Sequence, residues 1–202
     1  MLINPVIIRC PDCHTKMQHF EWLSGNTFGA VRWSDGFQQA PMMPDASEII
    51  RCNKCGAVHW QNKFQQIEDI DENEEYPAPE KPSVDDLMQF LHLKNYRNSD
   101  EEKYLRVHIW WKINDLIRNI PDYSEFKACA NDFKDNLQQL VEMLNTDEFE
   151  GLLKAEAYRE LGEFRMCIKI LNALRSTPDY GKDHKVIRRK ARFRNRKLFE
   201  FK

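Results

Sequence analysis

The sequence predicts an α+β protein in which a small antiparallel β part is followed by an all-α helical bundle. A Cys-rich, glycine-bearing segment fills the first 66 of the 202 residues. An acidic segment with three prolines follows, and its composition opposes both helix and sheet. Beyond it, apolar residues recur at helical spacing. We therefore expect a β domain at residues 1–66, a linker at 67–83 and a helical domain at 84–202.

The overall composition is that of a folded globular chain, with 42% hydrophobic and 31% charged residues. It contains no apolar run long enough to span a bilayer, and its start lacks the basic region of a secretory signal. We therefore expect a cytoplasmic protein with reduced cysteines. The net charge of −2 averages an acidic middle and a basic end, because the last 21 residues alone carry +8.

The N-terminal part contains an internal repeat. Residues 7–13 (IIRCPDC) recur as residues 49–55 (IIRCNKC), and each copy reads as a short strand that runs into a Cys-x-x-Cys turn. Between the copies, Asp35-Gly36 lies between AVRW and FQQA, which predicts a β-hairpin, because Asp-Gly suits the positive φ angles of a tight turn. Prolines at 41 and 44 are expected to end the return strand.

The strongest chemical signal is the pair of Cys-x-x-Cys turns. Cys10, Cys13, Cys52 and Cys55 place four thiolates where Zn²⁺ prefers them, at the corners of a tetrahedron. Disulfides, an iron centre of the rubredoxin type and chance are the alternatives. A closed four-Cys set leaves no open coordination position, so the predicted zinc is structural, one ion per chain.

The two turns, CPDC and CNKCG, resemble the knuckles of the zinc-ribbon family, with His14 in the position where the first knuckle often has glycine. This resemblance implies a β ribbon around one zinc ion, and the long gap between the knuckles indicates an inserted hairpin. His14, His19 and His59 lie near the knuckles and could replace a thiolate or hydrogen-bond to sulfur, which we consider less favoured. Cys129 and Cys167 fall on apolar helix stripes and are expected in the core.

A glycine-bearing loop is the candidate recognition surface of the N-terminal part. It lacks the Gly-Lys-Ser/Thr ending of a phosphate-binding loop and leads into a strand-like run, so it more naturally shapes a turn. The candidate residues are Ser24, Gly25, Asn26, Thr27, Phe28, Gly29 and Trp33.

Helix starts and stops divide the C-terminal part. We expect N-caps at Ser83, at Ser99 with Glu102, and at Thr146, and a terminating glycine at Gly162. Pro121 and Pro178 end two further helical patterns. Apolar stripes include Leu105, Ile109 and Ile113 in one helix and Phe126, Cys129, Phe133, Leu137, Leu140 and Leu144 in the next.

The segment from 147 to 178 resembles the tetratricopeptide (TPR) family over about one repeat. The matching residues are Ala155, Tyr158, Gly162, Phe164, Cys167, Leu171, Leu174 and Pro178. In that family, stacked helix pairs bind peptides on a concave face, so the resemblance implies a protein partner. No second repeat lies in register, because the position 34 residues before Gly162 falls inside another helical pattern. We therefore expect a single TPR-like hairpin within a compact bundle.

The basic end of the chain reads as a last helix from about residue 183 to 194, followed by an alternating KLFEFK. Docking on the chain's own acidic surface is the favoured interpretation, with Val186, Ile187, Phe193, Leu198 and Phe199 as anchors. Nucleic acid is the next, and a protein partner or an anionic membrane surface the third. The candidate binding residues are Arg188, Arg189, Lys190, Arg192, Arg194, Arg196 and Lys197.

These features together predict a non-catalytic interaction or adaptor protein that has a structural zinc site and a helical protein-binding domain. The alternative is a nucleic-acid-binding module that uses the ribbon and the basic tail. No arrangement of nucleophile, base and orienting acid is legible, so an enzyme is the least supported class. The combination resembles uncharacterised bacterial zinc-ribbon proteins with helical C-terminal domains, a resemblance that implies no particular activity.

Overall fold

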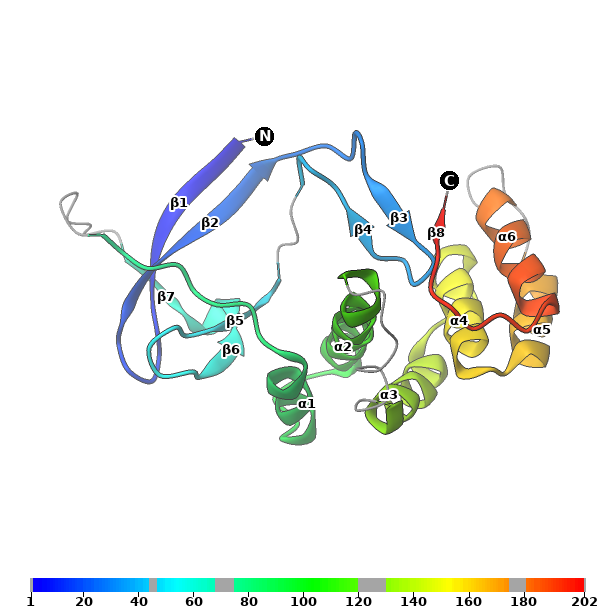
Figure 1. Cartoon of the computed structure of the whole chain (residues 1–202). Coiled ribbons are helices and arrows are strands. Elements are labelled where there is room, and N and C mark those ends of the chain that lie inside the picture. The colour runs from blue at the N-terminus through cyan, green and yellow to red at the C-terminus, as the bar shows by residue number, and fades with distance from the viewer. Residues whose placement is uncertain (1, 44–46, 68–74, 120–129, 175–180, 202) are drawn as a thin grey trace. The chain divides into compact units, whose positions relative to one another are not determined.

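A computed structural model of the chain describes residues 2–43, 47–67, 75–119, 130–174 and 181–201. These residues form small antiparallel sheets followed by six helices, which confirms the predicted α+β class (Figure 1). Their contacts divide the chain into two compact units. Unit 1 comprises Met1–Ala30 and Gln39–Phe90, and unit 2 comprises Val31–Gln38 and Leu91–Lys202.

Unit 1 is built around a long antiparallel strand pair. β1 (Leu2–Arg9) pairs with β2 (Lys16–Ser24) on one side and with β7 (Gln65–Ile67) on the other. A second pair consists of β5 (Ile49–Arg51) and β6 (Val58–Trp60), which is followed by the short 3₁₀ helix η1 (Gln61–Lys63). Alternate side chains of the strands point inward. The resulting core contains Val6, Ile8, Cys10, Met17, Ile50, Cys52 and Phe64.

The described part of the predicted linker is hydrogen-bonded along the β structure of unit 1. The Gln18 amide donates to the Pro77 carbonyl at 3.1 Å, and Arg51 and Glu80 exchange two backbone hydrogen bonds of 3.1 and 2.9 Å. Residues 68–74 lie outside the described residues. The segment from 77 to 80 therefore adds a fixed, extended strap to unit 1.

Helix α1 (Val84–His92) begins with the cap that the sequence predicts. The Ser83 hydroxyl accepts from the Asp86 amide at 3.1 Å, and the Asp86 carboxylate accepts from the Ser83 amide at 2.8 Å. This reciprocal pair satisfies two backbone donors that a helix start leaves without partners.

Unit 2 contains the other five helices, and consecutive helices pack on one another. They are α2 (Ser99–Asn119), α3 (Ala130–Met143), α4 (Glu148–Leu161), α5 (Phe164–Ala173) and α6 (Gly181–Arg192). The predicted stripes Leu105, Ile109, Ile113 and Phe133, Leu137, Leu140, Leu144 are buried. Of the other predicted helix residues, Pro121, Phe126, Cys129 and Pro178 lie outside the described residues.

Two predicted helix caps were wrong by one residue. Helix α2 is capped by Asn98, whose side-chain oxygen accepts from the Glu101 amide at 2.9 Å, and not by Ser99. Helix α4 is capped by Asp147, which accepts from the Glu150 amide at 3.0 Å, and not by Thr146. Both errors occur where two good capping residues adjoin, because residue preference alone cannot choose between neighbours. Gly162 ends α4 with a φ of +87°, as predicted.

The Asp35-Gly36 hairpin is confirmed. β3 (Val31–Trp33) and β4 (Gln38–Gln39) flank the turn, Gly36 has a φ of +81°, and the Trp33 amide donates to the Phe37 carbonyl at 2.8 Å. The other edge of β3 pairs with β8 (Glu200–Phe201), the strand formed by KLFEFK. The hairpin falls within residues 1–66, the range predicted for the β domain. Its contacts nevertheless place it in unit 2, with the helices.

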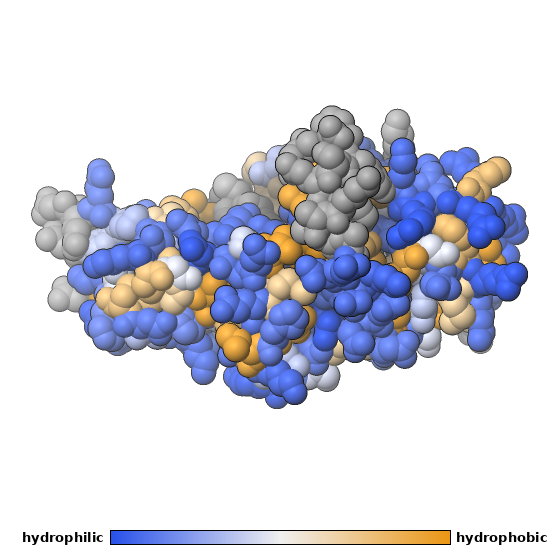
Figure 2. Space-filling view, turned by 60° about the horizontal axis from the view of Figure 1, so that its bottom comes forward, coloured by the Kyte–Doolittle hydropathy of each residue, from blue (hydrophilic) through white to orange (hydrophobic). Residues whose placement is uncertain are grey.

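On the face shown in Figure 2, hydrophilic residues cover most of the surface of the described residues, and smaller hydrophobic areas lie between them. Among the described helices, none combines the length and the hydrophobicity needed to cross a bilayer.

Candidate metal centre and binding surfaces

The two Cys-x-x-Cys turns fold in the same way. The His14 amide donates to the Cys10 carbonyl at 3.1 Å, and the Gly56 amide donates to the Cys52 carbonyl at 3.0 Å. The residue after each second cysteine is left-handed, with φ of +60° at His14 and +75° at Gly56. Glycine adopts this conformation without strain, whereas histidine does so at a cost. The predicted correspondence of His14 with the glycine position is therefore confirmed in backbone geometry.

The turns bring four sulfur atoms together. The Sγ atoms of Cys10, Cys13, Cys52 and Cys55 all lie within 4.8 Å of one another. Cys10 Sγ is 3.8 Å from Cys55 Sγ, and Cys13 Sγ is 3.6 Å from Cys52 Sγ. A tetrahedron with metal–sulfur bonds near 2.3 Å has edges of about 3.8 Å. The four sulfurs therefore fit one tetrahedral metal ion, and both close pairs join one turn to the other.

The thiols differ in burial and acidity. Cys10 and Cys52 are fully buried, whereas Cys13 is half-buried and Cys55 is exposed. Burial raises the pKa of the Cys10 thiol to about 12. The hydrogen bond to the Thr15 hydroxyl, 3.2 Å from Cys13 Sγ, lowers the pKa of Cys13 to about 6. Metals bind thiolates, so a metal ion held by the four cysteines would keep the Cys10 thiol deprotonated.

Histidine does not contribute to the cluster. Within the described residues, the group that could hold a metal consists of the four cysteines alone. His59 instead pairs with Asp12, with Nε2 3.1 Å from the carboxylate, and His14 is exposed. The cysteines outside the cluster behave as expected where they are described, because Cys167 is fully buried between the helices. Cys129 lies outside the described residues.

The candidate recognition loop contains a highly exposed aromatic residue. Phe28 is 83% exposed, and its amide donates to the Asn26 side chain at 3.0 Å. Gly25 cannot carry a side chain without a shift, because a Cβ there would lie 2.7 Å from the Met42 carbonyl oxygen. Trp33, which the sequence grouped with this loop, lies on β3 in unit 2.

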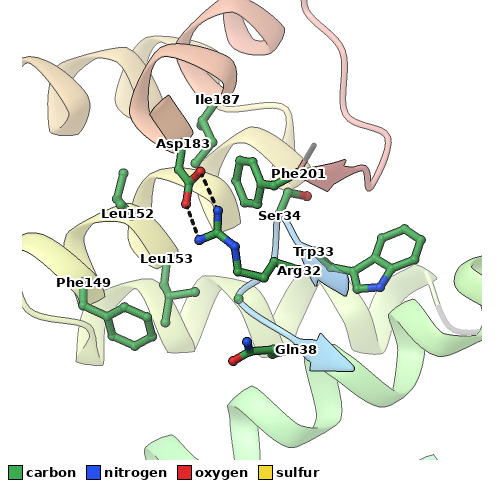
Figure 3. Close-up of a pocket in the computed structure, with 11 residues that line it drawn as sticks. Arg32, Trp33, Ser34, Gln38, Phe149, Leu152, Leu153, Asp183, Ile187 and Phe201 are labelled. Atoms are coloured by element: carbon green, nitrogen blue, oxygen red, sulfur yellow. Dashed lines mark hydrogen bonds and ion pairs between the residues drawn. The ribbon is translucent and has the colours of Figure 1, made fainter. Parts of the chain in front are cut away.

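Unit 2 contains a cavity of about 250 Å³ that sequence reasoning missed. Figure 3 shows Leu152 and Leu153 of α4 on one wall. Arg32 of β3 and Asp183 of α6 form two hydrogen bonds of 2.9 and 3.2 Å across another side. The remaining lining residues are Trp33, Ser34, Gly36, Gln38, Phe149, Ile187 and Phe201. The lining residues come from four separate parts of the chain, the 31–39 hairpin, α4, α6 and β8, so no local pattern in the sequence marked them.

The basic tail is docked within unit 2 through both its helix and its end. Ile187 and Ala191 of α6 are buried, and Val186, Leu198 and Phe199 are partly buried. Arg159 donates to the carbonyls of Asn195 and Lys197, and Arg196 donates to the Glu160 carbonyl at 2.7 Å. These contacts dock the tail within unit 2 through apolar side chains and backbone carbonyls, whereas no ion pair among the described residues joins a cation of the tail to the acidic surface that the sequence analysis favoured.

One predicted anchor of the tail was wrong. Phe193 is 79% exposed, because it follows the last turn of α6. There the chain leaves the helix through a left-handed residue, Arg194, with a φ of +51°. The candidate cations Arg189, Arg192, Arg194, Arg196 and Lys197 are also exposed, whereas Arg188 and Lys190 are half-buried.

A buried polar network lies in the interior of unit 2. Asp35 and Arg118 form an ion pair whose side chains are 0% and 4% exposed, and the Asn114 amide donates to Asp35 at 2.8 Å. Trp110 Nε1 donates to Glu160 at 2.9 Å. Burial raises the pKa of the Glu160 carboxyl well above its ordinary value. Asp35 thus anchors the hairpin to α2 as well as shaping its turn, a role that the sequence did not indicate.

No protein-family model, curated protein or solved structure matches this chain.

Proposed function

We propose that this protein is a non-catalytic interaction protein in which one structural Zn²⁺ stabilises unit 1 and the helical unit 2 binds a partner. The observation that carries the proposal is the set of four sulfurs at tetrahedral spacing. Four thiolates complete the coordination of Zn²⁺ and leave no position for a substrate or an activated water. A metal held in this way contributes to folding and not to catalysis.

The metal proposal is tested by identifying the bound metal and by measuring the effect of its loss on the stability of the protein. We expect about one zinc per chain by elemental analysis. Cys52→Ser should abolish metal binding and lower the melting temperature, because Cys52 is fully buried and contacts Cys13 of the other turn. Cys167→Ala is the matched control, since it removes a buried thiol outside the cluster. Iron in place of zinc, or unchanged metal content in Cys52→Ser, would contradict the proposal.

The cavity of unit 2 supports a protein partner. Its apolar wall of Leu152 and Leu153 has the size to accept one side chain, and the Arg32–Asp183 pair offers polar contacts at its side. Phe149 lines the cavity and is 52% exposed. Phe149→Glu should abolish capture of a partner by the purified protein, and Leu93→Glu, an equally drastic change at an exposed apolar residue outside the cavity, should not. Equal capture by wild type and Phe149→Glu would exclude this surface.

A second candidate function is nucleic-acid binding, which one specific observation favours. Exposed cations gather on α5, on α6 and on the turn after α6, and no ion pair with an acidic side chain joins them among the described residues. Phosphate groups would supply the missing negative charge.

A further inference from the structure

We infer that the cationic face of α5 and α6 binds single-stranded nucleic acid, with the phosphates along the helices and a base stacked on Phe193. This inference rests on the second candidate function, and it names the surface and the kind of strand. All the residues of this surface lie outside the four-cysteine cluster.

The exposed cations of α6 form one stripe. Lys182, Lys185, Arg189 and Arg192 are all exposed. With about 100° of turn per residue, their positions fall within roughly 80° of the helix circumference, and they extend over about 15 Å along the axis. The opposite side of α6 is the buried one, which contains Ile187 and Ala191. The packing of α6 therefore presents its cations outward as a row.

Helix α5 packs against α6 and adds two further exposed cations. Its exposed cations are Arg165 and Lys169. The two helices are held together at one end by the hydrogen bond from Arg188 to the Asn172 side chain, at 2.7 Å, and near the other by Arg194, whose guanidinium lies 5.8 Å from the centre of the Phe164 ring. We call the six residues of the two helices the cationic face: Arg165, Lys169, Lys182, Lys185, Arg189 and Arg192.

The charge of the cationic face is not neutralised by the neighbouring described residues. On α5 and α6 the described residues include one acid, Asp183, and it is ion-paired with Arg32. The nearest other acids among the described residues along the chain are Glu163, exposed just before α5, and Glu200, on β8, and neither is ion-paired with the cationic face there. A row of cations without counter-charges attracts a polyanion and releases its bound counterions.

Phe193 favours a single strand. It is 79% exposed and lies between Arg192 and Arg194, next to the cationic face. An exposed aromatic ring beside a cationic row is the usual platform for an unpaired base, whereas bases within a duplex are already stacked on each other. A membrane surface suits it less, since the apolar side of α6 is buried within unit 2 and Phe193, which follows α6, is flanked in the chain by Arg192 and Arg194.

The first experiment measures affinity and its salt dependence. A fluorescent oligouridine of about 15 nucleotides, titrated with the full chain, should bind with a log–log salt slope of about −0.7 per phosphate neutralised. Lys185→Glu and Arg189→Glu should each weaken binding and make the slope shallower. Lys134→Glu on α3 is the matched control, because Lys134 is an exposed lysine of the same unit outside the cationic face. No binding by wild type, or equal losses in all three variants, would overturn the inference.

The second experiment tests the base contact. Phe193→Ala should weaken oligouridine binding by about tenfold, and Phe193→Trp should restore it. Binding of heparin, a polyanion without bases, should not change in Phe193→Ala. Tighter binding to a duplex of the same length or to phosphatidylserine vesicles than to oligouridine would refute a single-strand site.

The zinc proposal and this inference fail separately. Metal content and the thermal melt are measured on the same samples, and the charge-reversal variants should retain both. If a charge-reversal variant loses oligouridine binding but retains zinc, the result supports the cationic face as the binding surface. Absence of zinc from the wild-type protein would refute the metal proposal, while the oligouridine titration still decides the inference about the face.

Discussion

Arg159 is the residue whose removal tests most directly how the tail is held. Its side chain is fully buried, and it donates to Glu156, also fully buried, through both Nε and Nη2. The same guanidinium donates to the carbonyls of Asn195 and Lys197 and lies 5.1 Å from the centre of the Phe199 ring. Arg159→Met keeps most of the apolar length of the side chain but removes every one of these polar contacts.

The expected loss of stability in Arg159→Met follows from the polar groups that the substitution leaves without a partner. Glu156 keeps a buried carboxylate without a counter-ion, and breaking such a pair costs about 3–5 kcal/mol. The two carbonyls also lose hydrogen bonds from a charged donor, although water can replace part of these because Lys197 is exposed. We therefore expect Arg159→Met to lower the free energy of unfolding by about 4 kcal/mol. The double variant with Glu156→Met should recover at least about 2 kcal/mol, since it removes the unpaired Glu156 carboxylate and leaves only the more distant Glu160, 3.8 Å from Arg159 in the wild type, to lose a counter-charge.

The assay combines urea unfolding with hydrogen exchange. The Ser34 amide donates to the Phe199 carbonyl at 2.9 Å, so its exchange rate reports whether the tail stays docked. Arg159→Met should accelerate this exchange, and the Glu156 amide within α4 should be affected less. A single variant that loses under about 1 kcal/mol, or a double variant as unstable as the single one, would refute the argument from the buried pair.

Three further predictions concern single residues. His14→Gly should raise stability, and Gly56→Ala should lower it, each by about 1 kcal/mol in thermal or urea unfolding, because both positions are left-handed. Glu160→Gln should stabilise the protein at pH 7–8. Burial raises the pKa of Glu160 above 4.5, so wild-type stability falls as pH rises from that value toward the folded pKa, and the melting temperature of the variant should decline less over this range. Ser83→Ala should cost about 1 kcal/mol in urea unfolding through loss of the α1 cap, and unchanged stability would refute the capping role.

Local patterns in the sequence predicted the class of fold, most of the helices and the cluster of four cysteines. Each of these depends on short-range rules. Cysteine spacing specifies a knuckle, Asp-Gly specifies a hairpin, and a helical period specifies a buried stripe. The repeat of IIRC at residues 7–10 and 49–52 was enough to pair two knuckles 42 residues apart, because each copy has the same strand and turn.

Contacts between distant segments could not be predicted from the same patterns. Nothing in AVRW or KLFEFK says that Arg32 pairs with Phe201, and either segment has the alternation of any edge strand. The buried pair of Asp35 and Arg118 is likewise invisible, since a turn aspartate and a helical arginine both read as surface residues. The cavity is lined by residues that such long-range contacts bring together, so it could not be predicted from the sequence either.

The pairing of β3 with β8 affects the order in which the chain can fold. Ser34 and Phe199 are 165 positions apart, so the sheet of unit 2 has a very high contact order. During synthesis the segments of unit 1 have all emerged once residue 90 has left the ribosome, whereas the hairpin at 31–38 has no strand partner on its β8 side until residue 201 follows. Until then β3 exposes a free edge, the part of a nascent chain most open to mispairing. Pulse proteolysis of stalled nascent chains would show the hairpin protected only after the last strand is released.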